Sequence, residues 1–343
     1  MEKYRVGIVG ATGMVGQRFI SLLKDHPWFE VNCVAASARS AGKTYREAVG
    51  ERWAFAWEIP EKVAGMTVVD AADIDEVSKH VDFVFCAVDM KKDEIRALEE
   101  AYAKHEIPVV SNNSACRGIE DVPMVVPEIN ADHLAVIEAQ KKRLGTKNGF
   151  IAVKPNCSIQ SYVPALTPLL DFEPEKVSVC TYQAISGAGK TFKTWPEMVD
   201  NVIPYIGGED EKSENEPLKL WGHVEDGKIV NATLPVISAQ CLRVACSDGH
   251  MAAVSVSFKK KPTIEQIKER WANYETEAQR LELPSAPKPF LQYFEDPSRP
   301  QTRLDRDFQN GFGVSIGRLR EDKLFDYRFV CLSHNTVRGA AGG

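Results

Sequence analysis

The sequence predicts an α/β protein in which a doubly wound parallel sheet is followed by an α+β domain with a mixed sheet. Short apolar segments alternate with amphipathic helical segments up to about residue 155, and longer β-type segments dominate the remainder. Strands joined by crossover helices form parallel sheets with helices on both faces. Long strands with few helices between them indicate mixed or antiparallel sheets.

The first region supports this prediction element by element. Val15, Phe19, Leu22 and Leu23 are spaced as the apolar stripe of one helix. We expect strands at Arg5–Val9, Val31–Ala36 and Val81–Ala87 and from Val109 onward, and helices at Met14–Lys24 and Lys91–His105.

The second region contains longer β-type segments and fewer helical ones. We expect strands at Lys176–Ala184, Cys241–Ala245, Met251–Phe258, Gly313–Arg318 and Tyr327–Leu332, with one clear helix at Thr263–Ala278. The stretch Gly207–Pro217 is acidic and poor in apolar residues, which is typical of a mobile surface loop.

Composition excludes several classes of protein. The 343 residues suffice for two domains, and 44% hydrophobic with 26% charged residues is ordinary for a globular protein. A net charge of -6 argues against a nucleic-acid-binding surface. We expect no signal peptide and no membrane span, because the N-terminus enters a strand pattern at once and no long apolar run follows. The eight cysteines are scattered without metal-ligand spacing, so we expect reduced thiols, no metal site and a cytoplasmic protein.

A glycine-rich segment lies between the first strand and the first helix. It runs Gly10, Ala11, Thr12, Gly13, Met14, Val15, Gly16. Glycines at such a turn allow a pyrophosphate to approach the backbone at the positive end of the helix. A glycine pattern alone is weak, but its place after the first strand of an alternating pattern predicts a Rossmann-type dinucleotide site.

The end of the second strand indicates which dinucleotide binds. Enzymes that use NAD carry an acidic residue there for the ribose 2′-hydroxyl. This chain has Ser37, Arg39 and Ser40 instead, without a carboxylate. An arginine and two hydroxyls suit a 2′-phosphate, so NADP is the predicted cofactor.

Cys157 is the candidate nucleophile. It follows the apolar strand Phe150–Val153 and precedes the helical run Ile159–Leu170, so it lies near a helix N-terminus that favours the thiolate. A thiolate can attack an aldehyde, and hydride loss then leaves a thioester. Most cysteines are inert core residues, so the position of Cys157 alone favours a structural cysteine over a nucleophile. His250 follows turn residues and leads into a β run, which suggests the mouth of a strand.

Several motifs together resemble the aspartate-β-semialdehyde dehydrogenase family, closer to its archaeal and fungal branch than to the common bacterial one. The blocks are GATGMVGQRF (10–19), SARSAGK (37–43), SNNSACR (111–117), PNCSIQ (155–160), TYQAISGAGK (181–190), CLRVACSDGH (241–250) and NTVRGAAGG (335–343). They occur in the expected order over nearly the whole chain.

The resemblance implies a role for each matching residue. Cys157 matches the acyl-forming nucleophile, His250 the acid/base that takes the thiohemiacetal proton, and Gln183 a substrate-orienting glutamine. Arg243 matches the arginine that binds the substrate carboxylate. The remaining matches are Glu216 and Lys219 for the substrate amino group and phosphate, Asn112 and Arg117 for phosphate, and Gly189 and Asn335 for the nicotinamide half of NADP.

The family resemblance also implies an activity and an organisation. The expected reaction is NADPH-dependent reduction of β-aspartyl phosphate to aspartate β-semialdehyde and phosphate, in the biosynthesis of lysine, threonine and methionine. We expect an NADP-binding domain of residues 1–156 and 334–343, and a catalytic and dimerisation domain of residues 157–333, in a homodimer or homotetramer. Family members continue beyond the position of Gly343 into a helix on the nucleotide domain, so cofactor affinity is expected to depend on that helix.

Two alternatives remain open at this level. Malonyl-CoA reductase and N-acetyl-glutamyl-phosphate reductase share the fold and the cysteine, although the TYQAISGAGK and ENEPLKL segments favour the semialdehyde dehydrogenase. A non-catalytic NADP-binding sensor would bind the cofactor without thiol chemistry. The joint presence of Cys157, Gln183, Arg243 and His250 argues against it.

Overall fold

The computed structural model describes residues 2–343, which form two compact units. Of the described residues, unit 1 contains 2–125, 132–154 and 224–229, and unit 2 contains 126–131, 155–223 and 230–343. The sequence-predicted domain boundary after residue 156 falls close to the division after Lys154. Residues 334–343, which were assigned to the nucleotide-binding domain, pack within unit 2.

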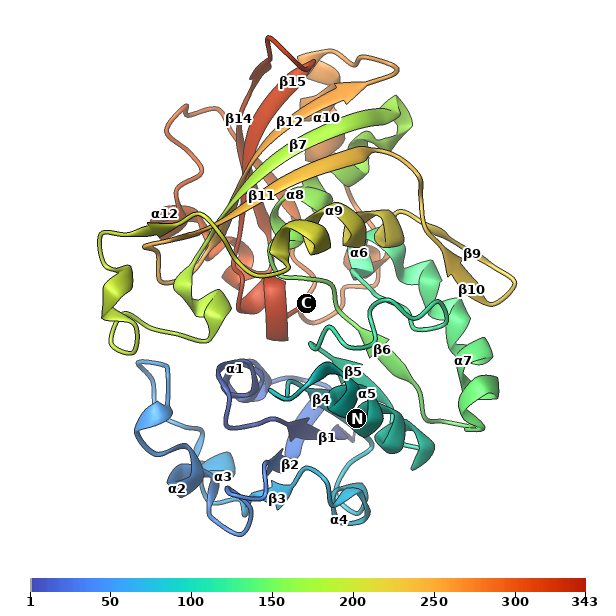
Figure 1. The fold of residues 1–343 in the computed structure, drawn as a ribbon, viewed down its shortest axis with the longest axis vertical. Coiled ribbons are helices and arrows are strands. Elements are labelled where there is room, and N and C mark those ends of the chain that lie inside the picture. The colour runs from blue at the N-terminus through green and yellow to red at the C-terminus, as the bar shows by residue number, and fades with distance from the viewer. Residues whose placement is uncertain (1) are drawn as a thin grey trace. The chain divides into compact units, whose positions relative to one another are not determined.

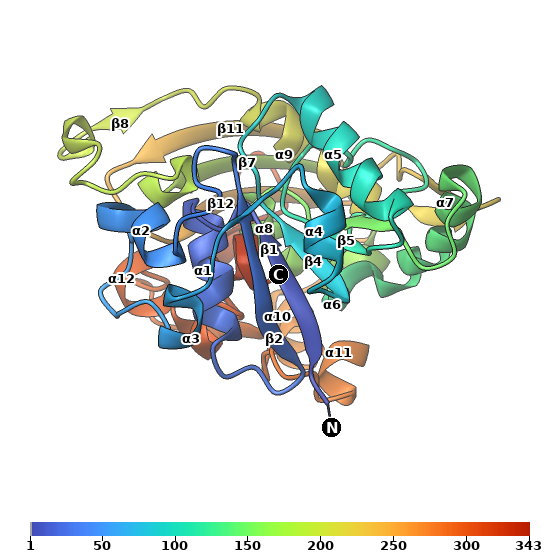
Figure 2. The same cartoon turned by 90° about the horizontal axis from the view of Figure 1, so that it is seen from below.

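Unit 1 is a parallel six-stranded sheet with the strand order β3-β2-β1-β4-β5-β6. The order reverses direction beside β1, which is the switch point where doubly wound sheets bind nucleotides. Helices α1 and α5 lie on opposite faces of this sheet (Figures 1 and 2). Its strands are β1 (Tyr4–Val9), β2 (Phe29–Ala36), β3 (Val69–Asp70), β4 (Phe83–Cys86), β5 (Val109–Ser111) and β6 (Ile151–Val153). Its helices include α1 (Met14–Leu23), α2 (Tyr45–Val49), η1 (Gly50–Arg52), α3 (Glu61–Ala64), α4 (Ile74–Ser78), α5 (Lys92–Lys104) and α7 (Ile137–Leu144).

Unit 2 is built on a mixed seven-stranded sheet, with the order β13-β14-β15-β12-β7-β11-β8. Helices α8 and α10 pack against it, and Trp271 of α10 donates its indole N–H to the carbonyl of Ala165 in α8. Its strands are β7 (Pro174–Gln183), β8 (Val202–Ile203), β11 (Val236–Val244), β12 (His250–Phe258), β13 (Leu291–Phe294), β14 (Val314–Glu321) and β15 (Tyr327–Ser333). A separate two-stranded ribbon is formed by β9 (His223–Glu225) and β10 (Lys228–Val230).

The helical elements of unit 2 are mostly short. They are α6 (Pro127–Asn130), α8 (Ile159–Leu166), η3 (Thr167–Phe172), η4 (Ile185–Ala188), η5 (Pro196–Met198), α9 (Glu209–Leu220), α10 (Ile264–Ala272), α11 (Glu277–Arg280), α12 (Thr302–Asp305), η6 (Phe308–Gly311) and η7 (Val337–Ala341). The helix η2 (Ala131–Val136) joins residues of the two units. Residues alternate between buried and half-buried along β12, which is the period-2 pattern of a strand with one face on the core.

The interpretation of Gly207–Pro217 as a mobile surface loop was wrong, because most of that stretch belongs to helix α9. Its first turn carries three acidic residues, which the positive end of the helix dipole stabilises. Asp210 accepts the backbone N–H of Cys241 at 2.8 Å, and Glu214 accepts that of Ala239 at 3.0 Å. The acidic side chains therefore satisfy backbone donors of β11, and composition alone could not reveal these partners.

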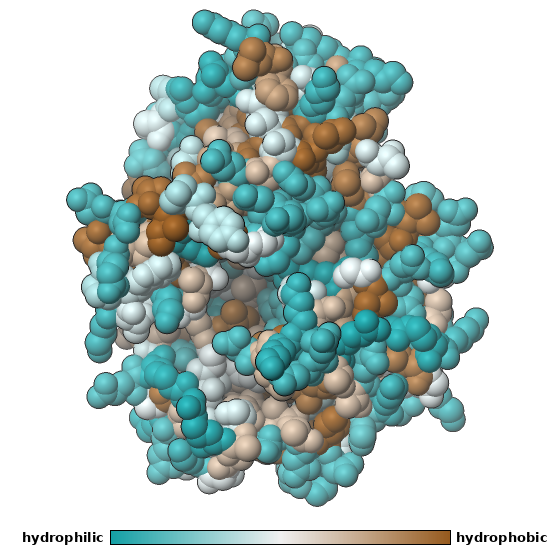
Figure 3. Space-filling model, in the orientation of Figure 1, coloured by the Kyte–Doolittle hydropathy of each residue, from teal (hydrophilic) through white to brown (hydrophobic). Residues whose placement is uncertain are grey.

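Within residues 2–343, no helix is both long enough and apolar enough to cross a membrane. On the face drawn in Figure 3, hydrophobic residues form scattered patches among hydrophilic ones. No disulfide joins any of the eight cysteines.

Candidate active site

Cys157 lies in a tight turn immediately before α8. The side chain of Asn156 closes this turn, because its Oδ1 accepts the backbone N–H of Ser158 at 2.8 Å and the Ser158 hydroxyl at 2.6 Å. Ser158 is the N-cap of α8, so Cys157 is held at the positive end of that helix dipole. This is the position that the sequence predicted for the nucleophile.

His250 is the first residue of β12 and is fully buried. Its Nε2 lies 3.4 Å from Cys157 Sγ, and its Nδ1 accepts the backbone N–H of Ala184 at 3.0 Å. Antiparallel pairing of β12 with β7 sets Met251 opposite Tyr182, which brings His250 beside the end of β7. The tertiary fold thus brings together two residues that are far apart in the sequence.

Gln183 and Arg243 are direct neighbours on the parallel strands β7 and β11. Arg243 Nη1 donates to the carbonyl of Ala184 at 2.7 Å, and both side chains are buried. Burial lowers the pKa of Arg243, while the nearby Cys157 and Glu209 oppose that shift. A buried guanidinium close to the thiol can both stabilise a thiolate and bind a substrate carboxylate.

Position 187 in η4 leaves little room for a side chain, which accounts for the glycine there. A Cβ there would lie 2.8 Å from Arg243 Nη1 and 3.0 Å from both Cε1 and Nε2 of His250. Asn335 links Gly249, the residue before His250, to Ser186 of η4. Its Oδ1 accepts the Gly249 N–H at 2.8 Å, and its Nδ2 donates to Ser186 Oγ at 2.9 Å.

Helix α9 supplies two carboxylates to the same site. Glu216 accepts the backbone N–H of Asn156 at 2.5 Å, and Glu209 accepts the side-chain amide of Asn156 at 2.9 and 3.0 Å. Glu209 also accepts from Gln183 Nε2 at 3.2 Å and from Lys212 Nζ at 2.8 Å. Glu216 was among the residues predicted from the sequence, whereas Glu209 was not. Once the stretch is known to be helical, two glutamates seven residues apart would have indicated a shared face.

The other predicted residues of unit 2 are placed as follows. Lys219 is buried in the last turn of α9, and Gly189 ends η4 in the left-handed region with φ 67°. Gly339 approaches the nucleophile, because a Cβ on it would lie 2.9 Å from Cys157 Cβ. The C-terminal NTVRGAAGG block therefore packs directly on the cysteine.

In unit 1, the glycine-rich segment forms the turn between β1 and α1. Gly10 has φ +90°, and a Cβ on it would lie 2.3 Å from the carbonyl oxygen of Ala87. A Cβ on Gly16 would lie 2.3 Å from the carbonyl oxygen of Gly10. At Gly13, by contrast, the nearest atom to an added Cβ is at 3.5 Å, and Gly13 is exposed. Gly10 and Gly16 are thus required by packing, whereas Gly13 leaves room for a pyrophosphate.

This contrast predicts different outcomes for two glycine substitutions. Gly16→Ala should lower the free energy of unfolding by about 1–3 kcal/mol, because the methyl group overlaps backbone atoms. Gly13→Ala should leave stability nearly unchanged and weaken dinucleotide binding. Thermal unfolding and titration of NADPH fluorescence check the pair, and equal dinucleotide affinity in Gly13→Ala and the wild type would contradict it.

The remaining predicted residues of unit 1 lie in two loops and in the first turn of α1. Thr12, Met14 and Val15 are half-buried at the start of α1, next to Gly13. Ser37, Arg39 and Ser40 form a turn after β2 in which the Ser40 N–H donates to the Ser37 carbonyl at 2.8 Å. Ser37 and Arg39 are exposed, so their hydroxyl and guanidinium are accessible to a ligand.

Asn112 and Arg117 lie in the loop after β5. Arg117 Nη2 donates to the carbonyl of Asn112 at 3.0 Å, so the two residues are held together. The buried carboxylate of Glu99 on α5 supports this loop by accepting from Ser111 Oγ and, at 3.0 Å, from Asn113 Nδ2.

Most of the other thiols are unsuited to nucleophilic chemistry. Burial raises the pKa of Cys33 to about 12 and that of Cys241 to about 11, and it raises the pKa of Cys86, Cys116 and Cys331 as well. These thiols remain protonated near neutral pH, and the protonated form is a poor nucleophile.

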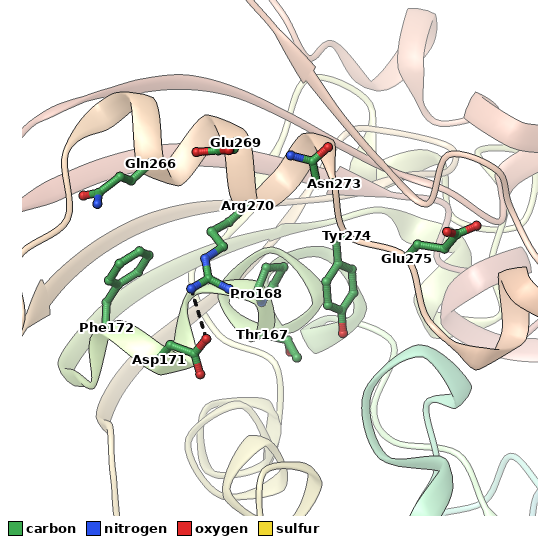
Figure 4. Close-up of a pocket in the computed structure, with 10 residues that line it drawn as sticks. All are labelled: Thr167, Pro168, Asp171, Phe172, Gln266, Glu269, Arg270, Asn273, Tyr274 and Glu275. Carbon is green, nitrogen blue, oxygen red and sulfur yellow. Dashed lines mark ion pairs between the residues drawn. The ribbon is translucent and has the colours of Figure 1, made fainter.

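A cavity of about 630 Å³ lies elsewhere in unit 2, between η3 and α10 (Figure 4). An ion pair of 3.1 Å between Arg270 and Asp171 crosses it. Two of its polar groups are already bonded, since Tyr274 donates to the Glu128 carbonyl and the Thr167 hydroxyl accepts from Trp221. None of the predicted site residues lines this cavity.

The chain is similar to known proteins over nearly its whole length. The family model "Semialdehyde dehydrogenase, NAD binding domain" matches residues 5–137, and "Semialdehyde dehydrogenase, dimerisation domain" matches 166–338. Aspartate-semialdehyde dehydrogenase from Archaeoglobus fulgidus is 43% identical, over 99% of this chain and 95% of that protein. The chain belongs to the aspartate-semialdehyde dehydrogenase family. It is therefore an oxidoreductase by family.

Two further members are similar to the chain over most of its length. The Schizosaccharomyces pombe aspartate-semialdehyde dehydrogenase is 44% identical, over 98% of this chain and 95% of that protein. The crystal structure of aspartate semialdehyde dehydrogenase with NADP from Candida albicans matches with a TM-score of 0.88 and 38% identity, covering 99% of this chain and 96% of that one. The predicted Rossmann-type sheet, the mixed second sheet and the resemblance to the archaeal and fungal branch are confirmed.

Proposed function

We propose that this family member catalyses the reversible, NADP-dependent interconversion of β-aspartyl phosphate with aspartate β-semialdehyde and phosphate, through a thioester on Cys157. The observation that carries this proposal is the contact between Cys157 Sγ and His250 Nε2 beside the buried Arg243. In the reductive direction the product serves the biosynthesis of lysine, threonine and methionine.

The cofactor proposed is NADP, which supplies hydride transfer when it is bound. Gly13 at the N-terminus of α1 suits its pyrophosphate because it leaves room for a ligand, while Gly10 and Gly16 allow the turn to pack closely. Ser37 and Arg39 suit its 2′-phosphate because they are exposed, whereas Ser40 is buried. Gly189 and Asn335 remain candidates for the nicotinamide half.

The substrate is a small amino acid semialdehyde with a carboxylate, an ammonium group and a reacting carbonyl. Arg243 is proposed to bind the carboxylate, and Gln183 to orient the carbonyl. Glu209 and Glu216 both suit the ammonium group. We favour Glu209, because its carboxylate contacts Gln183 and its charge acts on Arg243, whereas Glu216 accepts from a backbone amide.

Phosphate is proposed as the group that removes the acyl chain from Cys157. Asn112, Arg117 and Lys219 would supply its donors and counter-charges. Attack by a phosphate oxygen on the thioester carbon releases the Cys157 thiolate and forms the acyl phosphate.

Phosphate dependence tests the proposed function. With aspartate β-semialdehyde, purified protein should first reduce NADP in a burst that corresponds to acylation of Cys157. Sustained reduction of NADP should follow only when phosphate or arsenate is present. Equal turnover with coenzyme A and without phosphate would favour a malonyl-CoA reductase. A preference for N-acetyl-glutamate semialdehyde would favour the other reductase.

Replacing Arg39 tests how the cofactor is chosen. Arg39→Ala should weaken NADP binding about 10- to 100-fold, because a charge-assisted contact with the 2′-phosphate is lost. NAD, which has no 2′-phosphate, should bind nearly as before. Fluorescence titrations with NADPH and NADH measure both affinities, and a parallel loss would mean that another residue binds the 2′-phosphate.

We also propose a cytoplasmic homodimer or homotetramer. The reduced cysteines support the location. The dimerisation-domain match and the exposed Lys176, Ser178 and Tyr182 on β7 support an interface on that face of the mixed sheet. Light scattering of the purified chain tests the assembly.

A further inference from the structure

Glu99 of α5 carries a carboxyl group that is fully buried within unit 1. Acidic side chains are rarely buried, and hydrogen bonds must then compensate for the lost water. Here the donors come from the chain around the end of β5. Ser111 Oγ donates to Glu99 Oε1, and Asn113 Nδ2 donates to the same oxygen at 3.0 Å. The thioester reaction described above makes no use of this group.

The segment bonded to Glu99 begins at the carboxyl edge of the parallel sheet, where doubly wound sheets bind their ligands. Ser111 is the last residue of β5 and pairs with Cys86, the last residue of β4. The backbone N–H of the next residue, Asn112, donates to the Cys86 carbonyl at 2.9 Å. Glu99 therefore lies against the point at which the chain leaves the sheet and enters the loop 112–117.

Several side chains of this segment converge on Glu99. The Ser111 hydroxyl, which donates to Glu99, also accepts the backbone N–H of Asn113 at 3.0 Å. Asn113 Nδ2 lies 3.4 Å from Cys86 Sγ as well. Burial raises the pKa of the Cys116 thiol, and the adjacent Glu99 raises it further. Glu99 thus contacts the start, the middle and the second half of the segment 111–117.

Asn112 and Arg117, the proposed phosphate ligands of unit 1, alternate along the chain with these anchored residues. Arg117 Nη2 donates to the Asn112 carbonyl at 3.0 Å, and the Arg117 N–H donates to the Ser114 carbonyl at 3.3 Å. A loop that is ordered before its ligand arrives spends none of the binding free energy on becoming ordered. The buried contacts of Glu99 supply that order from below the loop.

We propose that Glu99 is a positioning residue for phosphate: by accepting from Ser111 and Asn113, it holds the loop in the conformation in which Asn112 and Arg117 bind the phosphate group. This inference rests on the proposed function, which assigns phosphate to these two residues. Glu99 acts through the loop and touches neither the phosphate nor the reacting atoms. Its effect therefore falls on the step that consumes phosphate, and acylation of the nucleophile, which precedes that step, does not depend on it.

Separate measurements of acylation and of phosphate use test this role. Glu99→Leu removes both acceptor oxygens, whereas Glu99→Gln keeps a carbonyl oxygen for Ser111 and Asn113. In Glu99→Leu the KM for phosphate should rise about tenfold, because two side chains must then be ordered on binding. The rate of the NADPH burst should stay within about twofold of the wild type. Glu99→Gln should restore most of the lost phosphate affinity.

Two further variants complete the experiment. Ser111→Ala removes the donor on the loop side and should raise the KM for phosphate in the same way, so the test holds even if Glu99→Leu does not fold. Glu100→Gln is the matched control, because Glu100 is the next residue of α5 and pairs with Arg96 at 3.2 Å. It should change neither the burst nor the KM for phosphate.

The outcomes separate this role from the proposed function. An unchanged KM for phosphate in Ser111→Ala and in folded Glu99→Leu would overturn the role of Glu99 alone. A burst that slows as much as phosphate use would also overturn it, because the residue would then act on the whole site. Wild-type turnover that does not depend on phosphate would instead overturn the proposed function, and the phosphate role of the loop with it.

Discussion

Replacing Cys157 by alanine is expected to abolish turnover, with a loss of about 10⁵-fold or more, because no other group can form the acyl bond. The burst of NADPH should disappear as well. NADP binding should persist, since the glycine-rich turn belongs to a different compact unit. Rapid-mixing absorbance at the NADPH band measures the burst, and fluorescence titration measures the binding.

Cys246→Ala is the matched control for this experiment. Cys246 is a half-buried thiol of the same unit, and its Sγ lies 3.7 Å from the Thr302 hydroxyl. This variant should keep both the burst and steady turnover. A residual burst in Cys157→Ala would contradict the thioester proposal, and loss of the burst in both variants would point to general damage.

Arg243→Lys is expected to lower kcat/KM for aspartate β-semialdehyde by about 10²- to 10³-fold, even though the charge is kept. The planar guanidinium donates to the Ala184 carbonyl while it lies near Cys157 and Glu209. A lysine offers a point charge and cannot reproduce that fork. Steady-state kinetics measure the loss.

A second aldehyde separates substrate binding from effects on the thiol. For an aldehyde of equal length without the α-carboxylate, Arg243→Lys should change kcat/KM much less. Arg328→Lys, on the exposed face of β15, serves as the control and should change neither value. Equal losses for the two aldehydes would mean that Arg243 acts on the thiol and not on the carboxylate.

Much of the fold could be predicted from local patterns. The alternation around Arg5–Val9 and Met14–Lys24 predicted β1 and α1 nearly to their ends. Such patterns succeed because apolar periodicity directly reflects which face of an element is buried. Apolar periodicity did not predict α9. Acidic side chains of this helix accept hydrogen bonds from the backbone of β11 and of Asn156, and these partners are distant in sequence.

The sequence by itself determined the glycine-rich turn after the first strand, the absence of an acid after the second, and a cysteine at a helix start. Each of these features depends on neighbours within a few residues. Only the tertiary structure decided that His250 meets Cys157, that Arg243 lies beside Gln183, and that Glu209 joins them. The physical reason is tertiary packing. Strand register in the mixed sheet aligns His250, Gln183 and Arg243. Cys157 and Glu209 reach them only because the segments of α8 and α9 pack against that sheet.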